Sequence, residues 1–102
     1  MRRYTLSPEA KADIREIRVY LKHEAGPRAV KAVLEKIVAA FVLLSRTPGA
    51  GHTREDLTTA PVRFWAVFSY LIVYNPAARP IEIVRVLHGY REVDAILEVG
   101  EG

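Results

Sequence analysis

Residues 62–89 have the sequence VRFWAVFSYLIVYNPAARPIEIVRVLHG, and this stretch decides the fold class. It contains three runs rich in β-branched and aromatic residues, which is the composition of strands. The runs cover residues 62–67, 70–74 and 81–87. Only Phe68-Ser69 separates the first two runs, and a short proline-containing turn precedes the third, so the connections suit antiparallel neighbours. The stretch therefore predicts a three-stranded antiparallel meander that ends at Gly89.

Two helices are expected before the meander. Residues 7–9 are Ser-Pro-Glu, in which serine can cap free amides, proline suits the first turn and glutamate favours the positive end of the helix dipole. Apolar residues then recur at helical spacing as far as Gly26-Pro27, and again from Val30 to Leu44. Glycine followed by proline ends the first helix. Because the connection is short, the two helices should form an antiparallel hairpin.

The remaining segments complete the expected order. Residues 4–6 can form a short strand, and residues 91–99 a short terminal helix. The order is then β-α-α-β-β-β-α in a single domain spanning residues 1–102. The predicted class is α+β, with the N-terminal helix hairpin packed on one face of an antiparallel sheet.

Composition restricts the kinds of function. The 102 residues include no cysteine, which excludes a disulfide framework and a thiolate zinc site. The three histidines lie far apart in the sequence, so no metal site is expected. No apolar run approaches the roughly 20 residues of a membrane span, and no secretory signal is visible, which favours a cytoplasmic location. The net charge of +3 fits an acidic or phosphate-bearing partner as well as an ordinary solvated surface.

Residues 85–91, RVLHGYR, form the most unusual segment. A strand ends there in a glycine turn that carries a histidine, a tyrosine and two arginines. These groups could cleave a phosphodiester, with arginine stabilising charge and histidine or tyrosine moving protons. They could equally form a structural corner, in which Arg85 pairs with a carboxylate such as Asp56 and His88 caps the strand end.

Three segments resemble the ParE branch of the ParE/RelE toxin superfamily. They are LSPEAKADIREI (6–17), RFWAVFSYLIVY (63–74) and IEIVRVLHGYRE (81–92). The resemblance implies the superfamily's small sheet with an N-terminal helix hairpin. It also implies a ParD-like antitoxin that wraps the toxin in a hetero-oligomer, and DNA gyrase as the target. No cofactor, metal or sequence-specific contact with nucleic acid is implied.

RelE-type relatives instead cut mRNA on the ribosome, using basic residues and a tyrosine near the C-terminus. The arginine of their middle strand falls on Leu71 here and the tyrosine on Leu97, whereas Arg91 retains a basic residue. Leucine can neither stabilise an oxyanion nor move a proton. The resemblance therefore favours a gyrase inhibitor without catalytic residues over an mRNA endoribonuclease, with a toxin-like fold that has lost its target as a third alternative.

Five valines lie outside the expected packing and are either scattered surface residues or a surface that the antitoxin covers. The first choice is a groove on the outer side of the helix hairpin near Val19, Val38 and Val42. The second choice is the other side of the sheet near Val84 and Val86.

The target is expected to contact the terminal segment. Arg91 is the first residue to test because a guanidinium can pair with a carboxylate or a phosphate. The full set of expected target contacts is His88, Tyr90, Arg91 and Leu97. A nuclease would instead have to be built from Arg63, Arg85, His88, Tyr90 and Arg91.

Overall fold

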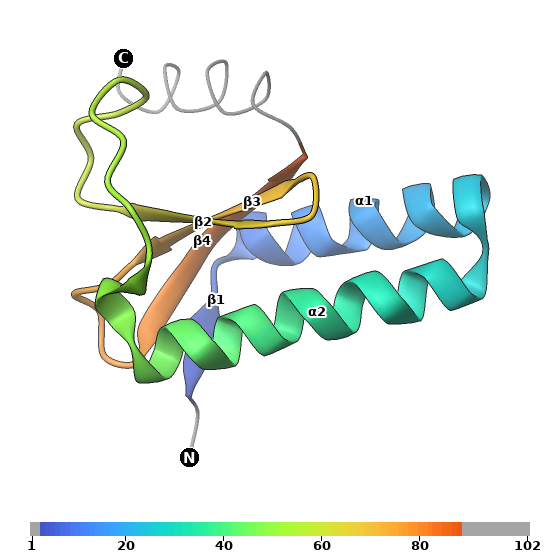
Figure 1. Cartoon of the computed structure of the whole chain (residues 1–102), viewed down its shortest axis with the longest axis horizontal. Helices are drawn as coiled ribbons and strands as arrows, with labels where there is room; N and C mark the ends of the chain where they lie inside the picture. Colours follow the sequence, from blue (N-terminus) through green and yellow to red (C-terminus); the bar gives the residue numbers. More distant parts are fainter. Residues whose placement is uncertain (1–2, 89–102) are drawn as a thin grey trace.

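The computed structural model of the chain describes residues 3–88 (Figure 1). Its elements are β1 (Tyr4–Leu6), α1 (Pro8–Ala25), α2 (Pro27–Arg46), the 3-10 helix η1 (Pro48–Ala50), β2 (Arg63–Val67), β3 (Tyr70–Asn75) and β4 (Ile81–His88). The predicted α+β class and the order β-α-α-β-β-β are confirmed. The helix predicted at residues 91–99 lies outside the described residues.

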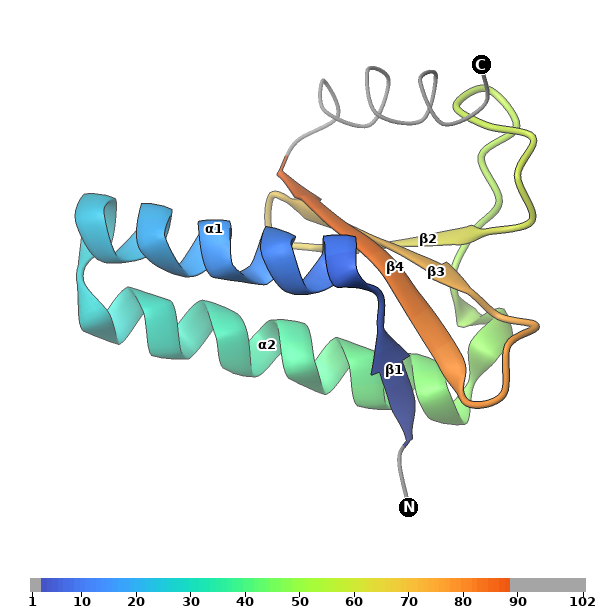
Figure 2. The ribbon, with the colours of Figure 1, turned by 180° about the vertical axis from the view of Figure 1, so that it is seen from behind.

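The helix hairpin forms where the sequence predicts it. Ser7 caps α1, and its Oγ accepts a hydrogen bond from the backbone N–H of Ala10 at 2.9 Å. Gly26 ends α1 with φ +89°, a conformation that L side chains rarely adopt, and Pro27 then begins α2. The two helices run antiparallel on one face of the sheet, as the views from both sides show (Figures 1 and 2). No helix in residues 3–88 is long and apolar enough to cross a membrane.

The sheet has the strand order β1-β4-β3-β2. The predicted meander is confirmed, because β2 pairs with β3 and β3 with β4, both antiparallel. The short strand β1 adds a parallel pairing with residues 81–83 of β4, so the complete sheet is mixed. The β2–β3 turn is formed by Phe68 and Ser69 as expected, with Phe68 at φ +56°.

The main core lies between the helix hairpin and the sheet. Its fully buried side chains include Ile37, Phe41, Leu44, Ile72, Tyr74 and Ile83. A smaller cluster lies on the opposite face of the sheet, where Leu57 and Val62 pack against it. Its buried members are Phe64, Leu71, Val73 and Leu87.

A bulge in β4 changes which side chains face the helices. Tyr74 pairs with Ile83 and Val73 with Arg85, so Val84 has no opposite residue on β3. One extra residue reverses the alternation of a strand. Val86 therefore joins Ile83 in the helix-facing core and is only 2% exposed, while Val84 packs against the opposite cluster. The expectation that Val84 and Val86 share the outer side of the sheet is wrong for Val86.

Candidate functional site

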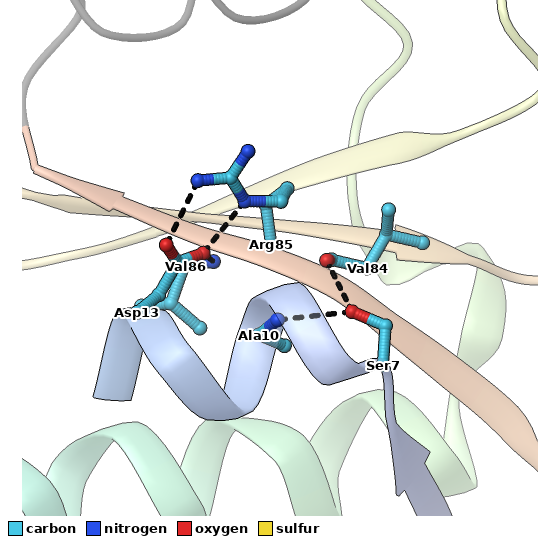
Figure 3. Close-up of polar contacts among 6 residues, drawn as sticks. All are labelled: Ser7, Ala10, Asp13, Val84, Arg85 and Val86. Atoms are coloured by element: carbon cyan, nitrogen blue, oxygen red, sulfur yellow. Dashed lines mark hydrogen bonds and ion pairs between the residues drawn. The ribbon is translucent and has the colours of Figure 1, made fainter. Parts of the chain in front are cut away.

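Arg85 of the RVLHGYR segment is bound by a carboxylate of α1 (Figure 3). Its Nε and one terminal nitrogen each donate a 2.8 Å hydrogen bond to Asp13. Both side chains are largely buried, with exposures of 22% for Arg85 and 10% for Asp13. The expected pairing of Arg85 with Asp56 is wrong, because Asp56 pairs with Arg54 in the loop before β2. Arg85 thus has the structural role that was one of the two alternatives for this segment.

The Asp13 carboxylate also binds the backbone at the edge of β4. Strand β1 covers only residues 81–83, so the backbone beyond them lacks a neighbouring strand on that side. Ser7 Oγ donates to the carbonyl of Val84 at 2.6 Å, and Asp13 accepts from the backbone N–H of Val86 at 2.9 Å. The first turns of α1 therefore supply the partners that a strand would have supplied, which explains a carboxylate on a buried helix face.

His88 ends β4 between two tyrosines. Its ring centroid lies 5.6 Å from that of Tyr20 on α1 and 4.9 Å from that of Tyr70 on β3. Burial, and then the neighbouring Tyr20, raise the pKa of the Tyr70 phenol, which stays neutral well above pH 7. The contacts among these three rings connect α1, β3 and β4 at one end of the sheet.

A cavity of about 170 Å³, here called the β4-end pocket, opens beside these rings. Residues of α1 at helical spacing form one wall, and the ends of β3 and β4 form the other. The lining residues are Asp13, Glu16, Ile17, Tyr20, Tyr70, Val86 and His88. Within the described residues, the side chain of Glu16 has no ion pair or hydrogen bond, so its carboxylate is available to a partner.

A second depression, here called the α1 recess, adjoins the pocket. Its surface is almost wholly apolar, and Val19, one of its lining residues, is 69% exposed. It is lined by Arg15, Glu16, Val19, Tyr20 and His23. Glu16 and Tyr20 belong to both depressions, which therefore form one continuous surface.

The valines proposed for the antitoxin are not all equivalent. Val19 and Val38 are exposed, at 69% and 45%, as their positions off the apolar stripes predict. Val42 is half-buried on α2 and, like Val38, does not line the α1 recess. The expected groove near Val19, Val38 and Val42 therefore remains a prediction, and of these three valines Val19 lines one of the two depressions described here.

The residues required for the nuclease alternative are not brought together in the described part of the chain. Arg63 donates to the carbonyl of Gly51 at 2.8 Å and lies on β2, separated from β4 by β3. Arg85 is held by Asp13, and Leu71, where RelE toxins carry an arginine, is buried at 6% exposure. Tyr90, Arg91 and Leu97 lie outside the described residues. Residues 3–88 also contain no group of three His, Asp or Glu side chains that could hold a metal ion.

Several residues that line the β4-end pocket could not be identified from the sequence. Asp13 interrupts the apolar stripe of α1 between Ala10 and Ile17, and a carboxylate in that position is a usable signal for a buried partner. Glu16 and Tyr20 give no such signal, because their importance depends on the β3 and β4 residues that pack opposite them.

Comparisons with known proteins agree on the family. The family model described as "ParE toxin of type II toxin-antitoxin system, parDE" matches residues 4–93. The protein "Toxin ParE1" of Caulobacter vibrioides is 33% identical over 88 residues, which covers 86% of this chain and 90% of that protein. A solved structure titled "Chromosomal ParDE TA system from P. aeruginosa" has the same fold, with a TM-score of 0.72 at 20% identity over 85% of this chain and 95% of the other. The chain therefore belongs to the ParE toxin family of type II toxin–antitoxin systems.

Proposed function

We propose that this ParE-family toxin arrests growth by binding DNA gyrase, and that a ParD-like antitoxin neutralises it by covering the toxin surface. Family membership supports the pairing with an antitoxin. The main support for binding over RNA cleavage comes from the positions at which a nuclease would need accessible catalytic groups. Leu71 is a core residue and Arg85 is bound in a bidentate ion pair, so neither is presented to a substrate.

The resemblance to RelE toxins also gives an energetic reason against RNA cleavage. Loss of one oxyanion donor typically lowers a rate by about 10² to 10³, and loss of a general acid or base by about 10² to 10⁴. Leu71 and Leu97 stand where RelE toxins carry two such groups. An inhibitor that acts by binding does not need those groups, but it does need a stable scaffold that presents a surface.

The antitoxin surface is assigned to the α1 recess. Val19 and Tyr20 are exposed at 69% and 50%, and large apolar groups side by side on a helix are typical of a surface that a partner covers. Val19→Asp should weaken the antitoxin complex at least tenfold without unfolding the toxin, since the side chain is exposed. Val38→Asp tests whether the interface extends to α2. An unchanged dissociation constant for Val19→Asp would remove the recess from the interface.

The target surface is assigned to the segment that starts at His88 and includes Tyr90, Arg91 and Leu97. The test adds purified toxin to gyrase with supercoiled plasmid and, in parallel, to translating ribosomes with a labelled message. Cleaved plasmid with intact message is the expected result, and cut message with unaffected gyrase would contradict it. Arg91→Ala should reduce plasmid cleavage, whereas Arg28→Ala, a control at the exposed tip of the helix hairpin, should not.

A further inference from the structure

We propose that the β4-end pocket receives an arginine side chain of the antitoxin, whose neighbouring aliphatic residue fills the α1 recess. This inference rests on the proposed function in naming the antitoxin as the partner. The partner must present a guanidinium, and the toxin residues that bind it are Glu16, Tyr20, Tyr70 and His88.

The pocket is large enough for one planar head group. Its volume of about 170 Å³ compares with the ~30 Å³ that one water molecule takes up in the liquid. The rings of Tyr20, Tyr70 and His88 supply flat walls. Aromatic faces attract cations, and a guanidinium adds stacking that an ammonium cannot provide.

The charge of the pocket selects a cation. Among the described residues, its carboxylates are those of Asp13 and Glu16, and no lysine or arginine lines it. Asp13 is already paired with Arg85, whereas the Glu16 carboxylate has no ion pair within residues 3–88. Glu16 lies one helical turn before Tyr20, which places its carboxylate and the aromatic ring on one side of α1. A guanidinium in the pocket can therefore contact both groups.

The neighbouring recess specifies what accompanies the arginine. It shares Glu16 and Tyr20 with the pocket but is apolar around Val19. A peptide that crosses both depressions needs a basic residue for one and an aliphatic residue for the other. Because His88 lines the pocket and is also the first residue of the proposed target segment, a peptide bound there would cover part of the target surface.

The first experiment titrates the full-length toxin with N-acetylarginine amide and follows the ring resonances of Tyr20, Tyr70 and His88 by NMR. Arginine amide should shift all three, the lysine analogue should bind more weakly, and the glutamine analogue should have no effect. Equal responses to the arginine and glutamine analogues would overturn the proposal. If arginine amide bound only after Arg91→Gln, the chain's own arginine would fill the pocket, and the assignment to a partner would be wrong.

Substitutions of the lining residues test whether arginine amide binds in the β4-end pocket. Glu16→Gln and Tyr20→Leu should each weaken arginine amide about two- to fivefold, as expected for one exposed ion pair or one cation–π contact. Both side chains are exposed, so neither variant should unfold the toxin. Glu35→Gln removes an exposed charge from α2, outside both depressions, and is the matched control. Equal affinities of wild type and Glu16→Gln would contradict the assignment.

The second experiment measures the complex with the antitoxin encoded beside the toxin. Glu16→Lys should raise its dissociation constant roughly tenfold or more, because like charges would meet. Glu35→Lys should leave it within about twofold. An antitoxin that binds wild type and Glu16→Lys equally would overturn this inference and leave the proposed function intact. An antitoxin that does not bind wild type would overturn the proposed function itself, and with it the partner named here.

Discussion

Two arginine–aspartate pairs in this protein have the same geometry and opposite surroundings. Arg85 and Asp13 lie 72 residues apart and join β4 to α1, with exposures of 22% and 10%. Arg54 and Asp56 lie two residues apart in one loop, with exposures of 38% and 63%. Each pair has two hydrogen bonds of 2.8 or 2.9 Å. Burial and sequence separation, not bond length, decide which pair holds the fold together.

The largest effect is expected from Asp13→Ala. It removes the carboxylate from a largely buried guanidinium and from the backbone N–H of Val86, and such a loss costs about 3 kcal/mol of unfolding free energy. Urea denaturation followed by the fluorescence of Trp65, the only tryptophan, measures it. Glu24→Ala, at an exposed position of the same helix, should change the free energy by less than about 0.5 kcal/mol. Equal losses of unfolding free energy for Asp13→Ala and Glu24→Ala would show that the buried pair stabilises the fold no more than an exposed side chain does.

A smaller effect is expected from Arg85→Lys. Lysine keeps the charge but cannot donate two parallel hydrogen bonds, so about 1–2 kcal/mol should be lost. The same denaturation experiment measures it, with Arg54→Lys as the matched change in the exposed pair. A loss as large for Arg54→Lys as for Arg85→Lys would contradict the comparison.

The smallest effect is expected from Asp56→Ala. The hydrogen bond from Arg54 lowers the pKa of the Asp56 carboxyl below its ordinary value of about 3.9. A lowered pKa contributes stability above the unfolded pKa, and this contribution is lost as the pH falls through the folded pKa. Because the pair is exposed, the urea midpoints of Asp56→Ala and wild type should coincide at pH 7. A clear difference there would show that the loop pair is structurally important.

The same contrast explains what the sequence could and could not predict. The Ser7 cap, the Gly26-Pro27 break and the β-branched and aromatic runs with their short connections are local signals, and they predict the hairpin and the meander. The partner of Arg85 was missed because Asp56 and Asp13 are equally acidic, and only the packing of α1 beside β4 selects Asp13. The bulge at Val84, and with it the burial of Val86, depends on pairing across the sheet and has no local signal.

The candidate site was predicted in part for the same reason. Val19 and Val38 could be placed on the surface by helical periodicity alone. The β4-end pocket could not be predicted, because its walls come from α1, β3 and β4, which lie far apart in the sequence. The proposed target contacts Tyr90, Arg91 and Leu97 follow from the family resemblance and remain predictions.

The central claim is that Arg85 belongs to the scaffold of a toxin that acts by binding. The most direct test is gyrase-dependent plasmid cleavage by wild type and by Asp13→Asn combined with Arg85→Met, each corrected for the fraction of folded toxin. The double variant removes the guanidinium and both charges while an amide oxygen can still accept from the Val86 N–H, so it should remain folded. Equal cleavage per folded molecule is the predicted result. A folded double variant that no longer promotes cleavage would contradict the account and make the Arg85 guanidinium part of the active surface.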